Sequence, residues 1–432
     1  MTPDPANPLI PASNNRPGDD PIFTLHGMAT RRAAAGEDIL NATLGALVED
    51  DGSLAVMPSV HEALRNTSLD RASAYAPISG PPEFLAAVER DVFHGHGLQS
   101  KCIAVATPGG SGAIYNAVTN FLEPGQKALT SSYYWAPYDI LTGLSDRGIC
   151  TFNMFGADGN LDLVSFEESL HALIAEQGRA LVILNSPCHN PTGYSFNEDE
   201  WRAVCDIMAK AADEGPVTLL IDFAYAKYAP EGDADWRDHV ARILPKVPTI
   251  VAWSASKAFA QYGARVGALI ALHEDDTIRD RIANAMGFTC RGTWSNCNHH
   301  GMIAIGEVLR DDKLHAAWDK DRARLVELLD ARVVEFNRLA AKHNLHYPRY
   351  EGGFFVAVFS DNHRWHASLP ARKSLTLRYR MNLLRSSSWA TSSNRFWMPS
   401  RRSSTGTPTS SAARSRVASA PRRRSIGAVP VM

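Results

Sequence analysis

The stretch WSASKAFAQYGARVG, residues 253–267, decides both the fold and the chemistry that we expect. Its lysine, Lys257, follows the apolar run 249–254 and is surrounded by small residues. A lysine at the carboxyl end of a buried strand can form a Schiff base with an aldehyde cofactor, and the nearby cation Arg265 would help to keep the amine nucleophilic. Arg265 and the hydroxyl of Ser254 could hold a phosphate. A lone lysine is more often a solvated surface residue, so this prediction depends on the rest of the chain.

Short apolar runs alternate with helix-like stretches from about residue 100 onward, which predicts an α/β fold. The runs are 102–107, 127–131, 180–185, 217–222, 249–254 and 266–272. One helix is expected over 196–214, with Asn197 as its cap. The alternation predicts a mostly parallel sheet that is covered on both faces. Because ligands bind such sheets at the carboxyl ends of the strands, the polar residues that end these runs are candidates for chemistry.

The 432 residues allow a large domain and a second, smaller one. We expect an N-terminal arm (1–20), an N-terminal segment of the small domain (21–60), a large domain (61–310), a partial small α+β domain (311–361) that is incomplete at its C-terminal side, and a basic tail (362–432). No Asp or Glu follows Asp361, while Ser and Arg dominate. The tail is either a low-complexity segment that binds a polyanion or, as we favour, a stretch that does not descend from the same reading frame.

The composition argues against several classes of protein. The formal net charge is −2, and the six cysteines include no CxxC pair, which is typical of a reduced, cytoplasmic protein. The N-terminus lacks the features of a signal peptide, and no apolar run approaches the roughly 18 residues of a membrane span. We therefore expect no membrane association and no metal site, and a nucleic-acid partner is not favoured.

Two other strand ends carry residues suited to a charged aromatic ring. Asp222 ends the run VTLLID, and a buried acid needs a positive partner or several hydrogen-bond donors. A protonated pyridine nitrogen is such a partner, and the pair makes the ring a better electron sink. Tyr225, in the same segment, and Asn190, in the loop NSPCHNPTGYSF, could both reach an oxygen on that ring. Taken alone, Asp222 could instead cap a helix, and Asn190 could belong to an ordinary turn.

Two further segments fit a phosphorylated ring. In TPGGSGA (107–113), Gly110 lets the backbone approach a phosphate, Ser111 adds a hydroxyl, and the helix that follows favours an anion at its N-terminus. Trp135, in SSYYWAPYDIL, could stack on the ring. A plain turn and ordinary core packing are the competing interpretations of these segments.

Together these residues resemble the aspartate and aromatic aminotransferase family of fold-type I pyridoxal-phosphate (PLP) enzymes. The likeness runs from about Leu40 to Phe359 and includes LGALVEDDG, YAPISGPPEF, GGSGA, WAPY, HNPTG, DFAY and SASKAFAQYGARVG in family order. The resemblance implies PLP as the cofactor. It also implies the transfer of an amino group from aspartate, glutamate or an aromatic amino acid to a 2-oxo acid by a ping-pong mechanism.

The resemblance also implies a role for each matching cofactor residue. Lys257 matches the lysine that holds the cofactor and shuttles a proton, and Asp222 matches the partner of the pyridinium nitrogen. Tyr225 and Asn190 match the partners of the ring oxygen, and Trp135 matches the stacking aromatic residue. Four residues match the family's phosphate site: Gly110, Ser111, Ser254 and Arg265.

Three further residues match positions near the substrate or the neighbouring subunit. Tyr75 matches a tyrosine that reaches the phosphate of the neighbouring subunit, so a homodimer is implied. Gly45 matches a glycine beside the substrate, and Arg291 matches an arginine that pairs with a dicarboxylate side chain across the dimer.

The sequence departs from the family in two places. WSNCNHHG, shortly after Arg291, replaces the usual stretch, and no arginine beyond Phe359 can be matched to the one that grips the substrate carboxylate. Because the cofactor residues serve many PLP reactions, β-elimination and decarboxylation stay open, as does an inactive PLP-binding protein.

Overall fold

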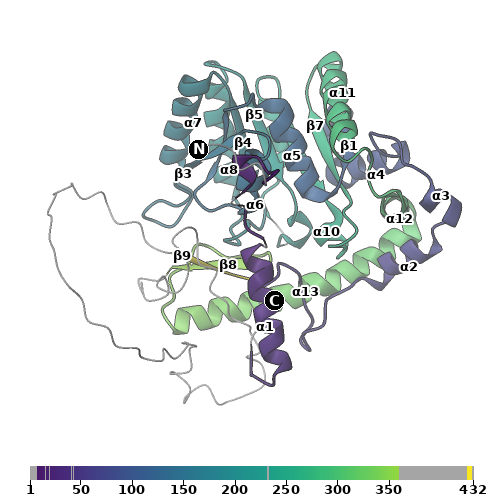
Figure 1. The fold of residues 1–432 in the computed structure, drawn as a ribbon. Coiled ribbons are helices and arrows are strands. Elements are labelled where there is room, and N and C mark those ends of the chain that lie inside the picture. The colour runs from purple at the N-terminus through teal and green to yellow at the C-terminus, as the bar shows by residue number, and fades with distance from the viewer. Residues whose placement is uncertain are drawn as a thin grey trace.

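The computed structural model describes residues 7–14, 16–18, 20–39, 41, 43–230 and 233–359, together with the backbone of 426–430. Its centre is a sheet whose strands lie in the order β1-β7-β6-β5-β4-β2-β3 (Figure 1). The strands are β1 (Cys102–Thr107), β2 (Lys127–Ser131), β3 (Gly148–Phe152), β4 (Ala180–Asn185), β5 (Val217–Asp222), β6 (Thr249–Ser254) and β7 (Gly267–Leu272). Pairing is parallel except around β7, which runs antiparallel to both β1 and β6.

This sheet confirms the predicted α/β fold class. Each of the six predicted apolar runs forms a strand, and β7 begins one residue later than the run that predicted it. The sequence analysis missed β3, which lies at the edge of the sheet and is largely half-buried, so its sequence GICTF lacks a long apolar run.

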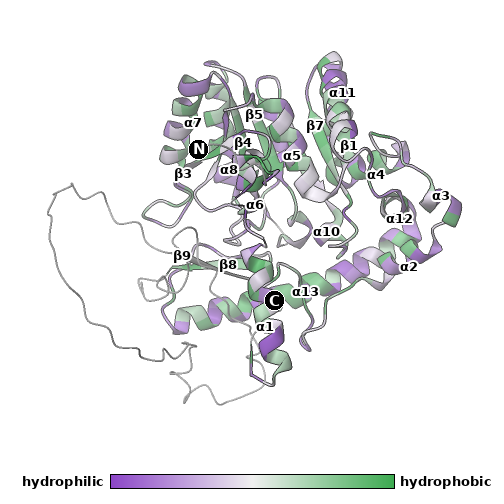
Figure 2. Cartoon of the chain, in the orientation of Figure 1, coloured by the Kyte–Doolittle hydropathy of each residue, from purple (hydrophilic) through white to green (hydrophobic). Residues whose placement is uncertain are grey.

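Both faces of the sheet are covered, as the strand composition predicted. In β4, Leu181 and Ile183 belong to one hydrophobic cluster, whereas Val182 and Leu184 belong to the other. This alternation follows from the two-residue repeat of a strand. Figure 2 shows the hydrophobic residues concentrated on the strands, between the helices.

The larger helices lie around the sheet and along one side of it. They are α1 (Pro21–Ala34), α2 (Pro58–Asn66), α4 (Pro82–Phe93), α5 (Gly109–Phe121), α6 (Pro137–Gly143), α7 (Leu163–Gln177), α8 (Glu198–Ala211), α9 (Trp236–Ile243), α11 (Asp276–Thr293), α12 (His299–Arg310) and α13 (Asp312–Lys342). Shorter helical segments are η1 (Pro11–Ser13), α3 (Leu69–Ser73), η2 (Gly97–Lys101), η3 (Ala226–Tyr228) and α10 (Ala255–Ala258). The helix predicted over 196–214 is α8, which begins after a capping box formed by Asn197 and Glu200.

The long helix α13 leads from the sheet domain to a smaller part of the molecule (Figure 1). There β8 (Phe355–Phe359) pairs antiparallel with β9 (Ile426–Pro430). The rest of the predicted tail, 362–432, lies outside the described residues, and the domain boundaries stay predictions. Within the described part of the chain, no helix has the length and apolar character that a membrane crossing requires.

A buried carboxylate joins three elements of the large domain. Asp91, in α4, accepts hydrogen bonds from Lys227 Nζ at 2.6 Å and from Trp253 Nε1 at 2.9 Å. Its side chain is only 3 % exposed. Lys227 lies in η3 and Trp253 in β6, so Asp91 holds both elements against α4.

Replacing this carboxylate should destabilise the protein. We expect Asp91→Ala to lower the free energy of unfolding by about 3 kcal/mol, because the change leaves a partly buried ammonium and an indole N–H without their acceptor. Urea unfolding of the purified protein measures the effect. Asp213→Ala is the matched control, because Asp213 pairs with Lys246 at the surface; its loss should cost about 0.5 kcal/mol or less. Equal losses in the two variants would contradict the structural role of Asp91.

Candidate functional site

The carboxyl ends of neighbouring strands bring together residues that are far apart in the sequence. The register pairs Asn185 of β4 with Asp222 of β5. Gly267, the first residue of β7, pairs with Ser254 of β6 on one side and with Thr107 of β1 on the other. Polar residues follow several of these strand ends. The predicted site therefore lies along the carboxyl ends of the parallel strands.

Asp222 is a buried acid, with 5 % of its surface exposed. Tyr138, at the start of α6, donates a hydrogen bond from its hydroxyl to Asp222 Oδ2 at 2.7 Å. Burial raises the pKa of Asp222, and the hydrogen bond from Tyr138 opposes that rise. The arrangement therefore holds a carboxylate in fixed orientation where a cationic partner would favour its ionised form.

A chain of hydrogen bonds connects Asp222 to the other predicted ring contacts. Asn185 Nδ2 donates to the carbonyl of Asp222 at 2.8 Å, and Asn185 Oδ1 accepts from the backbone N–H of Asn190 at 2.6 Å. Asn190 Nδ2 in turn donates to Tyr225 Oη at 3.3 Å. Burial raises the pKa of Tyr225, which keeps its hydroxyl protonated. The two predicted partners of one ring oxygen are thus brought together.

Lys257 lies in α10, directly after β6, and its amine is enclosed by aromatic rings. Its Nζ lies 4.8 Å from the ring centroid of Tyr262 and 5.6 Å from that of Tyr225. Burial lowers the pKa of Lys257 to about 8, the charge of Arg265 adds to this effect, and Asp222 opposes it. A lysine in this state has an appreciable neutral, nucleophilic fraction near neutral pH.

The N-terminus of α5 lies beside β6, the strand that leads into α10 and Lys257, and no side chain blocks it as a cap. Pro108 precedes this helix, and no side chain caps it. The first amide groups of a helix have no partners within it, so those of Gly110 and Ser111 are available. A Cβ at Gly110 would lie 3.5 Å from the Cβ of Ser254, which places the Ser254 hydroxyl at the same site.

Arg265 lies across this helix end. Its Nη1 donates to Ser256 Oγ at 3.2 Å and its Nη2 to the carbonyl of Pro108 at 3.3 Å. A Cβ at Gly109 would come within 2.5 Å of Arg265 Nη2, so only glycine permits this approach. Arg265 itself has a left-handed backbone, with φ of 53°, which indicates that its position is enforced by its surroundings.

Gly45 lies against β8, in a segment that also contacts the residues that follow Lys257. A Cβ there would meet Phe355 Cζ at 2.7 Å, and Leu47 N–H donates to Tyr262 Oη at 3.0 Å. Phe355 also contacts Tyr225 edge to face, with ring centroids 5.8 Å apart. The N-terminal segment and β8 therefore border the space next to Lys257.

The remaining predicted residues have different surroundings. Trp135 is half-buried and contacts Tyr138 edge to face, with ring centroids 5.7 Å apart. Tyr75 is 91 % exposed. Arg291, near the end of α11, is exposed and donates to Ser295 Oγ at 2.7 Å. Stacking by Trp135 and contacts of Tyr75 and Arg291 with a second subunit stay predictions.

Sequence reasoning missed three residues of the site: Tyr138, Asn185 and Tyr262. Asn185 ends a predicted strand, so the rule that polar strand ends carry chemistry could have found it. Tyr138 closes the motif WAPY, which was noticed only for its tryptophan, and Tyr262 lies inside the lysine segment.

The site as a whole combines a helix N-terminus that no side chain caps, a buried amine of lowered pKa and a buried carboxylate. These features fit PLP, whose phosphate, aldehyde and pyridine nitrogen require these three kinds of partner.

Comparisons with known proteins point to the same chemistry. The chain is 29 % identical over 346 residues to an aromatic-amino-acid aminotransferase of Paracoccus denitrificans, covering 78 % of this chain and 85 % of that protein. It is 27 % identical over 354 residues to an aspartate aminotransferase of Salmonella typhi, with coverage of 78 % and 85 %. The crystal structure of an aminotransferase from Anaerococcus prevotii superposes with a TM-score of 0.77 at 28 % identity, covering 82 % of this chain and 88 % of that one.

The family model described as aminotransferase class I and II matches residues 37–398. This match extends beyond Phe359, where the resemblance seen in the sequence ended. Because the match covers most of the chain and agrees with the fold and the site, the protein belongs to the aminotransferase class I and II family.

Proposed function

We propose that this protein is a PLP-dependent aminotransferase that moves an amino group from an amino acid to a 2-oxo acid by a ping-pong mechanism. The observation that carries the proposal is the grouping at one sheet edge of the Lys257 amine, the buried Asp222 carboxylate and the open N-terminus of α5. When bound, PLP supplies an aldehyde carbon and a ring that withdraws electrons from the substrate Cα.

Different residues of the site would bind the cofactor, move the proton and orient the ring. Lys257 would hold the cofactor through its amine, and the same amine, when free, would accept and return a proton at the substrate Cα. Asp222 keeps the ring nitrogen protonated, and Tyr138 fixes the orientation of that carboxylate. Asn190 and Tyr225 orient the ring oxygen.

The phosphate is held by charge and by directed N–H and O–H groups. The amides of Gly110 and Ser111, the hydroxyl of Ser254 and the guanidinium of Arg265 form this site. Trp135, which contacts Tyr138, would pack against the ring.

We propose aspartate, glutamate or an aromatic amino acid as the donor, since relatives that match 78 % of this chain include proteins named for aromatic amino acids and for aspartate. Gly45 borders the substrate space, and Arg291 is the cation for a dicarboxylate side chain. We also propose a homodimer: the exposure of Tyr75 and Arg291 in the single chain suits residues that complete the site of a second copy.

A half-reaction tests the proposed activity. With PLP-loaded protein and no 2-oxo acid, one of glutamate, aspartate or tyrosine should bleach the visible cofactor band. The products should be the corresponding 2-oxo acid and pyridoxamine phosphate in equal amounts, identified by chromatography and mass spectrometry. Pyruvate with ammonia would instead indicate β-elimination, and release of carbon dioxide would indicate decarboxylation. A band that none of the three amino acids changes would refute the proposed activity.

Tyr138→Phe tests the support of Asp222. Removing the donated hydrogen bond removes an effect that lowers the pKa of Asp222, so that pKa should rise. Because ionised Asp222 is required, the acidic limb of the kcat profile should move to higher pH. At neutral pH, kcat should fall by about tenfold, the loss expected for one hydrogen bond to a charged group.

Tyr134→Phe is the matched control, because the Tyr134 hydroxyl donates to Asp139 at 3.1 Å and its ring stacks on Tyr138. This variant should keep the pH profile of the parent protein. An unchanged acidic limb in Tyr138→Phe would rule out the proposed role of Tyr138.

A further inference from the structure

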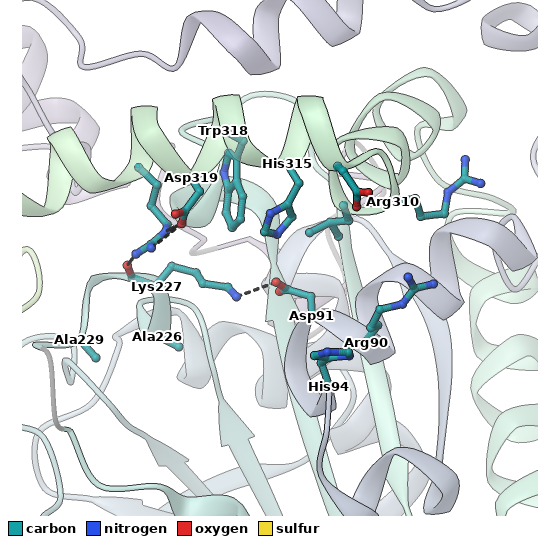
Figure 3. Close-up of a pocket in the computed structure, with 13 residues that line it drawn as sticks. Arg90, Asp91, His94, Ala226, Lys227, Ala229, Arg310, His315, Trp318 and Asp319 are labelled. Atoms are coloured by element: carbon teal, nitrogen blue, oxygen red, sulfur yellow. Dashed lines mark hydrogen bonds and ion pairs between the residues drawn. The ribbon is translucent and has the colours of Figure 1, made fainter.

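A hollow of about 540 Å³ lies between α4, η3, the end of α12 and the start of α13 (Figure 3). It contains none of the residues assigned to the cofactor. Figure 3 shows His94, Arg90 and His315 among its lining residues, and the ion pair between Lys227 and Asp91. We propose that this hollow, here named the α4–α13 pocket, binds a small multivalent anion that carries carboxylate or phosphate groups.

Two arginines of the pocket lining have no acidic partner in the part of the chain that the structure describes. Among the described residues, neither Arg90 nor Arg310 forms an ion pair, although both line the pocket. Arg310 donates only from Nε to the carbonyl of Gly306 at 3.1 Å, which leaves its terminal nitrogens for other acceptors. His94 and His315 add two imidazole rings that can donate to an anion.

The carboxylates in the lining are largely neutralised. Asp91 is buried against Lys227 and Trp253, and Asp319 accepts from Arg322 Nη2 at 2.7 Å. The third acid, Asp312, lies in the first turn of α13, and it is the one carboxylate of the lining without such a pair among the described residues. The positive charges of Arg90 and Arg310 therefore outnumber the one uncompensated negative charge.

A second basic hollow on the same protein shows the contrast. It is lined by Lys210, Arg242 and Lys246, among others. Each of these cations already pairs with a carboxylate: Lys210 with Glu167, Arg242 with Asp206 and Lys246 with Asp213. An anion that binds those cations would have to compete with a carboxylate already in place, whereas one that binds Arg90 and Arg310 in the α4–α13 pocket would not.

The location leaves the α4–α13 pocket clear of the proposed subunit contact. His299, at the start of α12, donates from Nδ1 to the carbonyl of Ala74 at 2.9 Å, next to Tyr75. Arg310 lies at the opposite end of the same helix.

The pocket is also connected to the cofactor site. Its lining includes Trp318, whose Nε1 donates to the carbonyl of Ala258, directly after the lysine proposed to hold the cofactor.

Calorimetric titration of the full-length, PLP-loaded protein tests the proposal, since the cofactor then fills the phosphate site at α5. Citrate and inorganic phosphate are the probes, at constant ionic strength. At least one of them should bind once per chain. Stronger binding of citrate identifies a carboxylate ligand, and stronger binding of phosphate identifies a phosphorylated one.

Variants locate the binding. Arg90→Gln and Arg310→Gln should each weaken binding by about fivefold, the effect of one exposed charge, and Asp312→Asn should strengthen it. Lys246→Gln, in the hollow with paired cations, should bind as the parent protein does. The absence of binding by both probes, or equal affinity in the parent and in both arginine variants, would overturn the proposal. A gain in Asp312→Asn distinguishes a lost site from a misfolded variant.

Discussion

The buried carboxylate of Asp222 is the constraint on which the site depends. A charge with 5 % exposure is costly unless cationic or donor groups surround it. The chain supplies the hydroxyl of Tyr138 and the amide of Ala224, but no cation forms an ion pair with Asp222 among the described residues. A protonated ring nitrogen would supply the missing close cation beside the charge of Lys257, and this is why we propose Asp222 as the contact of that nitrogen.

The parallel sheet makes this arrangement possible with few contacts. Because the ends of β4 and β5 are in register and β6 ends two residues beyond them, the residues that follow these strands need only short loops to meet. The antiparallel strand β7 performs a second task, since Gly267 lies between the ends of β1 and β6 and so draws the N-terminus of α5 toward Ser254. The strand register therefore brings together the N-terminus of α5, the segment that carries Lys257 and the carboxylate of Asp222.

Much of this could be predicted from the sequence because strands buried on both faces leave continuous apolar runs, and five of the six runs end at a polar residue. The six predicted runs and the positions of Lys257, Asp222 and Asn190 follow from that pattern. The edge strand β3 was missed because it is half exposed. Tyr138 was missed because its bond to Asp222 spans 84 residues, and no local pattern reports such a contact. The contacts proposed for Tyr75 and Arg291 would involve a second chain, so the structure of one chain does not test them.

The most direct test of the central claim is to reduce the PLP-loaded protein with borohydride and to map the modified peptide by mass spectrometry, at several pH values around 8. The account predicts a single modified residue, Lys257. Loading of the apoprotein should become faster as pH rises and be half-maximal near pH 8, because the amine is neutral above its lowered pKa of about 8. Modification spread over surface lysines, or loading that requires a pH near the ordinary pKa of lysine, would contradict the assignment of this site.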